Sequence, residues 1–338
     1  MIHYSFIFFL LCLGAACKQA ANEANEITAP SDQILTSFHK LSATPNTITY
    51  RNNLPVNNEG GHIQSIQPYT NGEGEFVIVT GSSSTASYYA IIKIGDNNEV
   101  ISVNPILEKP FKHAGGFQVH QNLMAIGIED NEARNVSKVY VYEIDTPLTP
   151  PEKPKKIIER TGAYERATAG CVGITRYKEQ VLVVVGDWGT RHLDIYACPL
   201  QTWEHDQTQF EQLTSMTASE IQKEEWSDPS WLSYQNINLI NWQDTLYLVG
   251  LGANSADEDV ADLFRMEETD LKDFHLKKIA SQKFEKKNGS SFRWGAGVAW
   301  NPEKGIERIL SCPAHINDIS LFNEYKSVLL LVNEPTCL

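Results

Sequence analysis

Four apolar runs along the chain each end on a glycine. These runs are short and unbroken, and they cover Phe76–Gly81, Leu123–Gly127, Val181–Gly186 and Leu246–Gly250. Their length, their β-branched and aromatic content and the Gly, Asn, Asp and Pro residues between them predict buried strands rather than helices. A shorter strand precedes each run and two more follow it. The chain therefore repeats a four-strand unit roughly every 45–65 residues.

Repeats of this size, built from several short strands, indicate an all-β fold of the β-propeller type. Five four-stranded blades fit between residue 47 and the C-terminus. The strands predicted for the fifth blade are Gly297–Trp300, Gly305–Leu310, Ile316–Phe322 and Ser327–Val332. The run Thr47–Tyr50 is expected to join the last sheet and close the ring, because an open ring leaves unpaired edges. Six blades remain the alternative if the Trp-rich segment 201–232 holds further strands.

The N-terminus has the pattern of an export signal. Phe6–Ala16 is an apolar run too short to span a bilayer, and small residues precede Cys17. The segment 13–17, LGAAC, resembles a bacterial lipobox, which implies a lipid on Cys17 as the mature N-terminal residue. An ordinary secretory signal is the alternative. We expect a signal peptide at residues 1–16, a flexible tether at 17–46 and the propeller domain at 47–338.

The formal net charge of −14 limits the partners. An acidic surface repels nucleic acid and anionic headgroups, so we expect no nucleic-acid partner and membrane contact through the lipid anchor only. The chain has no second apolar span. We expect a monomer without a cofactor, anchored to a bacterial membrane in the cell envelope, either periplasmic or surface-exposed.

Four cysteines lie beyond the signal region, an even number that permits two disulfides in an exported chain. Three pairings are possible, and proximity in sequence favours Cys171–Cys198 and Cys312–Cys337. A Cys312–Cys337 bond would hold the C-terminal strand in the last blade. No C-x-x-C motif is present, so a zinc site or a redox motif has no support.

In a propeller the innermost strand of each blade lines the channel, and ligands generally bind where these strands begin. The polar and aromatic residues at these positions are His62, His113, Arg166, Gln235 and Trp294. Asp187 and Trp188, in a loop between a second and a third strand, are expected over the same face. We predict a mouth that binds a neutral small molecule, a glycan or a protein, with Trp188 and Trp294 stacking on the ligand. The alternative is that these side chains only bond neighbouring blades together.

Acidic and histidine clusters offer little support for a metal. The segment 129–132, EDNE, is predicted to be a solvated turn. His62, His113 and His315 could meet on the axis and bind a transition metal, but no His-x-x-x-His spacing supports this. We therefore expect no metal site.

The layout resembles that of five-bladed glycosidases. This resemblance implies paired carboxylates on the innermost strands, because glycoside hydrolysis needs two at a defined separation. The predicted innermost strands contain no Asp or Glu, so any pair must come from loops, for example Asp130 with Asp187. We therefore predict a binding or scaffolding role at the channel mouth. The alternative is a propeller hydrolase or lyase that acts on glycan-type substrates with loop-borne carboxylates and histidines.

Overall fold

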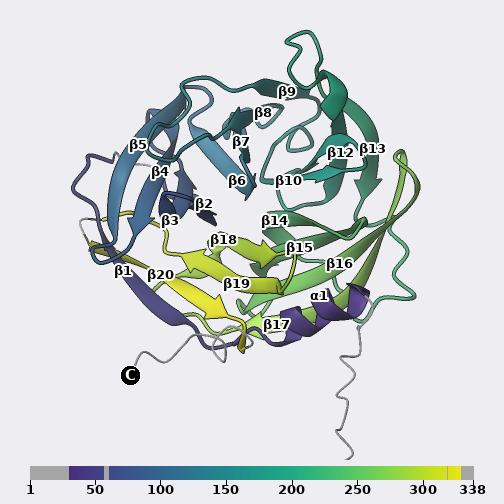
Figure 1. Ribbon diagram of the computed structural model, residues 1–338. Coiled ribbons are helices and arrows are strands. Elements are labelled where there is room, and N and C mark those ends of the chain that lie inside the picture. Colours follow the sequence, from purple (N-terminus) through teal and green to yellow (C-terminus); the bar gives the residue numbers. More distant parts are fainter. Residues whose placement is uncertain (1–29, 57–60, 318, 329–338) are drawn as a thin grey trace, which may run out of the picture.

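The computed structural model describes residues 30–56, 61–317 and 319–328, and its strands form a five-bladed β-propeller (Figure 1). Blade 1 consists of β2 (Ile63–Asn71), β3 (Gly74–Gly81), β4 (Ala86–Ile94) and β5 (Glu99–Glu108). Blade 2 consists of β6 (His113–His120), β7 (Leu123–Glu129), β8 (Val136–Glu143) and β9 (Lys156–Thr161). Blade 3 consists of β10 (Cys171–Tyr177), β11 (Gln180–Gly186), β12 (His192–Pro199) and β13 (Glu211–Thr217).

Blades 4 and 5 complete the ring. Blade 4 consists of β14 (Ser233–Trp242), β15 (Thr245–Ala253), β16 (Asp259–Asp270) and β17 (Asp273–Phe284). Blade 5 consists of β18 (Ser291–Asn301), β19 (Gly305–Cys312), β20 (Ile319–Lys326) and β1 (Asn46–Arg51). The segment 201–232 supplies β13 and part of the short 3₁₀ helix η1 (Leu200–Thr202) but no further blade, so the five-blade prediction is confirmed.

Strand β1 closes the ring, as the sequence predicts. It runs antiparallel to β20 over six residue pairs, from Asn46 opposite Glu324 to Arg51 opposite Ile319. The fourth strand of blade 5 therefore comes from the N-terminal side of the domain. The predicted strand Ser327–Val332 does not fill this place, and its residues 329–332 lie outside the described part of the chain.

The glycine-ended runs are the second strands β3, β7, β11 and β15. Almost every residue in them is buried, because each lies between the sheets of neighbouring blades. A strand buried on both faces appears in the sequence as an unbroken apolar run. The glycines allow close approach: a side chain on Gly127 would collide with the carbonyl of Ala169, and one on Gly250 would lie 2.7 Å from the ring of Tyr234.

Helix α1 (Pro30–His39) lies inside the segment predicted as a tether, and here the structure differs from the prediction. Ile34 and Phe38 are fully buried and join the apolar cluster between blades 4 and 5 that contains Trp242. The main-chain N–H of Ile306 donates to Ser37 Oγ at 2.9 Å, which holds the helix against β19. The folded part of the chain therefore begins before residue 47.

The predicted Cys171–Cys198 disulfide is wrong. Both residues are buried free thiols. Cys171 lies opposite Gly186 at one end of β11, whereas Cys198 lies opposite Val181 near its other end. Strand β11 separates the two cysteines, so their short separation in sequence does not bring them together.

Two covalent predictions concern residues outside the described part of the chain. Cys17 and the signal peptide at residues 1–16 lie before it, and Cys337 lies after it. Cys312 is buried, with its Sγ 3.6 Å from the carbonyl oxygen of Gly295. Lipidation of Cys17 and the Cys312–Cys337 bond stay predictions. In the described residues, no helix combines the length and the hydropathy that a membrane span requires.

Candidate functional site

The starting ends of three innermost strands meet at one mouth of the channel. The ring centroid of His62 lies 5.8 Å from that of His113 and 5.4 Å from that of Trp294. His62 directly precedes β2, His113 begins β6 and Trp294 lies near the start of β18, so blades 1, 2 and 5 contribute. We call these three side chains, together with Glu129, the mouth cluster. Their part in ligand binding stays a prediction.

Glu129, the last residue of β7, lies directly opposite His113 in the β6–β7 ladder. Its Oε1 is 3.4 Å from His113 Nε2, and its side chain is fully buried. Oε2 accepts a hydrogen bond from the main-chain N–H of Ala169 at 2.8 Å. Oε1 has no hydrogen-bond partner among the described residues. This oxygen is therefore free to share a proton with the imidazole of His113.

Burial drives both members of this pair toward their neutral forms. It raises the pKa of Glu129 to about 7; the hydrogen bond from Ala169 opposes this shift and the charge of Asp187 adds to it. Burial also lowers the pKa of His113 to about 3, with a smaller contribution from His62. The pKa of His62 is itself lowered, chiefly by burial. Near neutral pH, His113 is therefore uncharged while Glu129 is close to its titration midpoint.

The prediction of a solvated turn at residues 129–132 is wrong for Glu129. Counting back from the turn between His120 and Leu123 would place Asp130 opposite His113. A bulge between Ala114 and Phe117 shifts the register by one residue and places Glu129 there instead. A one-residue shift turns a side chain to the other face of a sheet, so a regular ladder without this bulge would not place Glu129 opposite His113.

Asp187 and Trp188 lie in the loop between β11 and β12. Asp187 accepts a hydrogen bond from the main-chain N–H of His192 at 2.9 Å, and its other oxygen lies 3.0 Å from His192 Nδ1. The guanidinium of Arg134 lies 3.9 Å from the ring centroid of Trp188. This cation covers one face of the Trp188 indole, for which the sequence predicts stacking on a ligand.

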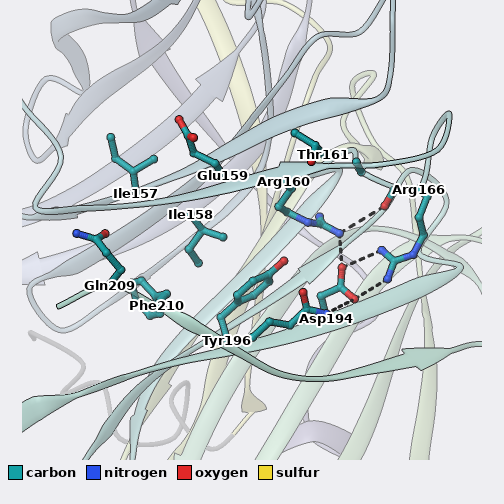
Figure 2. A pocket seen from close by; sticks show the side chains of 12 residues that line it. Ile157, Ile158, Glu159, Arg160, Thr161, Arg166, Asp194, Tyr196, Gln209 and Phe210 are labelled. Atoms are coloured by element: carbon teal, nitrogen blue, oxygen red, sulfur yellow. Dashed lines mark hydrogen bonds and ion pairs between the residues drawn. The ribbon is translucent and has the colours of Figure 1, made fainter. Parts of the chain in front are cut away.

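Arg166 lies in a separate groove between blades 2 and 3, with a volume of about 820 Å³ (Figure 2). Its guanidinium donates two hydrogen bonds to Asp194, at 2.8 and 2.6 Å. Arg160 donates to the same carboxylate, and also to the carbonyl of Thr168. The two arginines thus tie blade 2 to blade 3. Arg166 does not join the mouth cluster.

Gln235 lies at a bulge between Tyr234 and Asn236, near the start of β14. Its carbonyl oxygen lies close to Gly116 of β6, so its main chain faces the channel. In the described part of the chain, its side chain forms no hydrogen bond or ion pair with the mouth cluster.

Buried amides fill the channel below the mouth. Gln67 and Asn238 exchange hydrogen bonds across it, at 3.4 and 3.1 Å. The side-chain oxygen of Gln118 accepts from the main-chain N–H groups of Ile174 and Leu239, both at 2.8 Å. These amides bond blade to blade and separate one mouth of the channel from the other.

The mouth cluster contains three side chains of types that can bind metals, His62, His113 and Glu129. Within the described ranges, no group of three or more His, Cys, Asp or Glu side chains has the arrangement of a metal site. His315 is exposed.

No family model matches this chain, and no curated protein matches it significantly. Several solved structures are similar at low sequence identity. A bifunctional GH43-CE protein of Bacteroides eggerthii is 12% identical with a TM-score of 0.45, over 76% of this chain and 32% of that protein. The family 117 glycoside hydrolase Zg3597 of Zobellia galactanivorans is 10% identical, with a TM-score of 0.46 over 87% and 94% of the two chains. The catalytic domain of a Coprinopsis cinerea GH62 α-L-arabinofuranosidase is 12% identical, with a TM-score of 0.47 over 82% and 96%.

This chain thus spans about a third of the Bacteroides eggerthii protein and nearly all of the length of the other two. All three are glycoside hydrolases or contain one, whereas the sequence pattern favoured a binding or scaffolding role. That prediction is wrong. The mouth cluster also gathers several titratable groups with shifted pKa values.

Proposed function

We propose that the protein is a glycan-acting hydrolase of the β-propeller type, with acid–base chemistry at the mouth cluster. The observation that supports this most directly is the buried Glu129–His113 pair, with a carboxyl pKa of about 7 and an Oε1 that has no hydrogen-bond partner in the described ranges. Cleavage of a glycosidic bond needs a proton for the leaving oxygen. A carboxyl that titrates near neutral pH is suited to supply it.

His113 is the member of the pair that we expect to contact the substrate. Its Nε2 faces Glu129 at 3.4 Å, and the other side of its ring faces His62. In the proposed step, His113 donates the proton on Nδ1 to the leaving oxygen while protonated Glu129 returns a proton to Nε2. Glu129 then acts through His113, and a neutral imidazole is the form that this transfer requires.

Trp294 and Asp187 would complete the site. Trp294 is half-buried beside His62, so its indole can stack against a sugar ring. Hydrolysis also needs a second carboxylate to activate water or to attack the anomeric carbon. We assign this role to Asp187, whose negative charge already acts on Glu129. The proposed pair is therefore Glu129 with Asp187, rather than Asp130 with Asp187.

The direct test is incubation of the purified protein with neutral and acidic polysaccharides, followed by measurement of reducing ends and product masses. Products that have gained water identify a hydrolase, and products without added water identify the alternative lyase. We expect His113→Asn to reduce turnover by about 10²–10⁴-fold, the range for loss of general acid catalysis. Glu129→Gln should remove the limb of the pH–rate profile near pH 7.

His275→Asn is the matched control, because this histidine lies exposed on β17, away from the mouth. It should leave turnover unchanged. An enzyme whose turnover survives His113→Asn, or a protein that releases no product from any polysaccharide, would contradict the proposed function.

We also propose that this activity is located in the cell envelope, periplasmic or surface-exposed, with a monomer held by a lipid on Cys17. The support is the short apolar run 6–16 and the small residues before Cys17. A glycan-acting enzyme in this position would meet polymers outside the cytoplasm.

A further inference from the structure

The opposite ends of the five innermost strands surround a cavity of about 650 Å³, which we call the far pocket. Its lining includes residues from β2, β6, β10, β14 and β18, from Pro68 to Trp300. Strand β6 runs from His113 in the mouth cluster to His120 in the far pocket. At about 3.3 Å per residue, the two sites lie on the order of 20 Å apart. The buried amides of the channel lie between them.

Arg176 brings a positive charge to the far pocket and forms no ion pair with a carboxylate of the described residues. Its Nη1 and Nη2 donate to the neutral side chains of Gln121 and Asn122, at 2.9 and 3.0 Å. Its Nε is buried and has no partner among the described residues. Guanidinium groups bind carboxylates through charge-assisted hydrogen bonds. The guanidinium of Arg176 is therefore available to bind an anion in the far pocket.

The other charges in the lining are already compensated. Arg308 forms ion pairs with Glu324, at 2.8 Å, and with Glu75. Glu307 lies 3.8 Å from Lys304. Among the charged groups described in the lining, Arg176 is the one left with neutral partners alone.

Trp300 and Asn241 add features that fit a sugar. Trp300 is half-buried, and its ring is inclined by only 13° to that of His120, with the centroids 6.0 Å apart. Burial lowers the pKa of His120 to about 4, so this ring is neutral at pH 7. Asn241 donates through Nδ2 to the carbonyl of Arg176 at 2.9 Å, while its buried Oδ1 has no partner within the described part of the chain. A flat ring and a free acceptor suit a pyranose with hydroxyl groups.

We infer that the far pocket binds a carboxylate-bearing sugar of the uronic acid class. The pyranose ring lies against Trp300, its carboxylate accepts from Arg176, and a hydroxyl group donates to Asn241. The volume lies within the usual range of small-molecule sites, roughly 300–1,000 Å³. This site is additional to the proposed catalytic mouth and does not depend on its chemistry.

The test is calorimetric titration of the full-length protein with glucuronate and galacturonate, with glucose and acetate as the two partial ligands. We expect at least one uronate to bind with a Kd of about 1 mM or tighter, and glucose and acetate to bind at least about tenfold more weakly. Arg176→Gln should weaken uronate binding by about tenfold or more, whereas Arg176→Lys should retain part of it. Trp300→Leu should weaken uronate and glucose alike.

Arg265→Gln is the matched control, since this arginine lies on β16 and pairs with exposed Glu267. It should leave uronate binding unchanged. His113→Asn should also leave it unchanged, so a failure of the catalytic proposal would not affect this test. No uronate binding at about 10 mM, equal affinity for glucose, or full binding by folded Arg176→Gln would each overturn the inference.

Discussion

Burial raises the pKa of Glu129 and lowers the pKa of His113, and both shifts favour the neutral form of the side chain. In water at neutral pH the carboxyl would be ionised, and a charged imidazole beside it would form an ion pair. In the mouth cluster, desolvation disfavours both charges, so the pKa of the acid rises and that of the base falls. Protonated Glu129 and neutral His113 are therefore both favoured, and these are the forms that the proposed proton transfer uses.

Glu129→Gln should change how the stability of the protein depends on pH. The pKa of Glu129 is about 7 in the folded state and about 4.5 when unfolded, so the folded state holds a proton that the unfolded state loses between these values. The contribution of this proton to the free energy of unfolding is on the order of 3 kcal/mol. It is fully present below about pH 4.5 and is lost as the pH rises through 7. Glutamine cannot ionise. The free energy of unfolding, measured with urea at pH 4.5 and pH 8, should therefore rise for Glu129→Gln relative to the wild type at the higher pH.

Glu132→Gln provides the control for this measurement. Glu132 is exposed in the same loop and pairs with Lys112. Its substitution should shift the free energy of unfolding by a similar small amount at both pH values. Parallel curves for wild type and Glu129→Gln would contradict the raised pKa.

At the scale of elements, the sequence predicts best the strands that are buried on both faces. Their unbroken apolar runs identify β3, β7, β11 and β15 directly. Strand β18 begins at Ser291, six residues before the predicted start, since its first part holds polar residues and a positive-φ glycine at Gly295. The sequence does not predict the bulge in β6 for a similar reason, because Gly115 and Gly116 at the bulge give no hydrophobic pattern. That bulge decides which acid faces His113, so the fold could be predicted while this part of the site could not.

Helix α1 gives the second prediction. Phe38 is fully buried between blades 4 and 5, in the cluster that includes Trp242 and Tyr325. Phe38→Ala should destabilise the folded domain by about 3–5 kcal/mol, because it leaves a cavity in a packed region. Thermal unfolding monitored by circular dichroism measures this loss.

His39→Ala is the adjacent control, because His39 is exposed at the end of the same helix. It should change stability by less than about 0.5 kcal/mol. Equal melting temperatures for Phe38→Ala and the wild type would show that residues 30–46 behave as the tether predicted from the sequence.

At the scale of the whole molecule, the repeat spacing favoured five blades over six, and the unpaired edges of an open ring predicted the closing strand. Disulfide pairing could not be predicted in the same way, because it depends on the distance between cysteines in space, which their spacing in the sequence does not give. Cys171 and Cys198 are close in sequence, yet strand β11 lies between them. The N-terminal prediction rests on a processing signal rather than on folding.

Lipidation of Cys17 is tested on protein isolated from the membrane fraction of a bacterial host. Mass spectrometry should find no peptide from residues 1–16 and a lipid-modified Cys17 at the mature N-terminus. Cys17→Ser should move the protein from the membrane fraction to the soluble fraction. An unmodified N-terminus elsewhere in the chain would contradict the proposed anchor.

Closure of the ring by β1 gives the last prediction. Thr49 is exposed and Leu321 is half-buried, and the two lie directly opposite in the β1–β20 ladder, so Thr49→Cys with Leu321→Cys places two thiols across the closure. Cross-strand neighbours lie about 4.5–5.5 Å apart between Cα atoms, within the range of a disulfide. The bond would join the first and last strands of the propeller and enclose nearly the whole ring. In the chain-entropy model it should stabilise the oxidised form by about 5 kcal/mol relative to the reduced form.

The matched control is a pair inside one blade, Arg265→Cys with Lys277→Cys, which are opposite each other on β16 and β17. This bond closes only a short loop and leaves the ring closure unchanged, so it should stabilise less, by about 3 kcal/mol. Melting temperatures with and without reducing agent measure both effects. A gain at the β1–β20 pair no larger than that at the control pair would contradict the prediction that this bond constrains the much longer loop. A larger gain is the expected result, because the β1–β20 bond encloses nearly the whole ring.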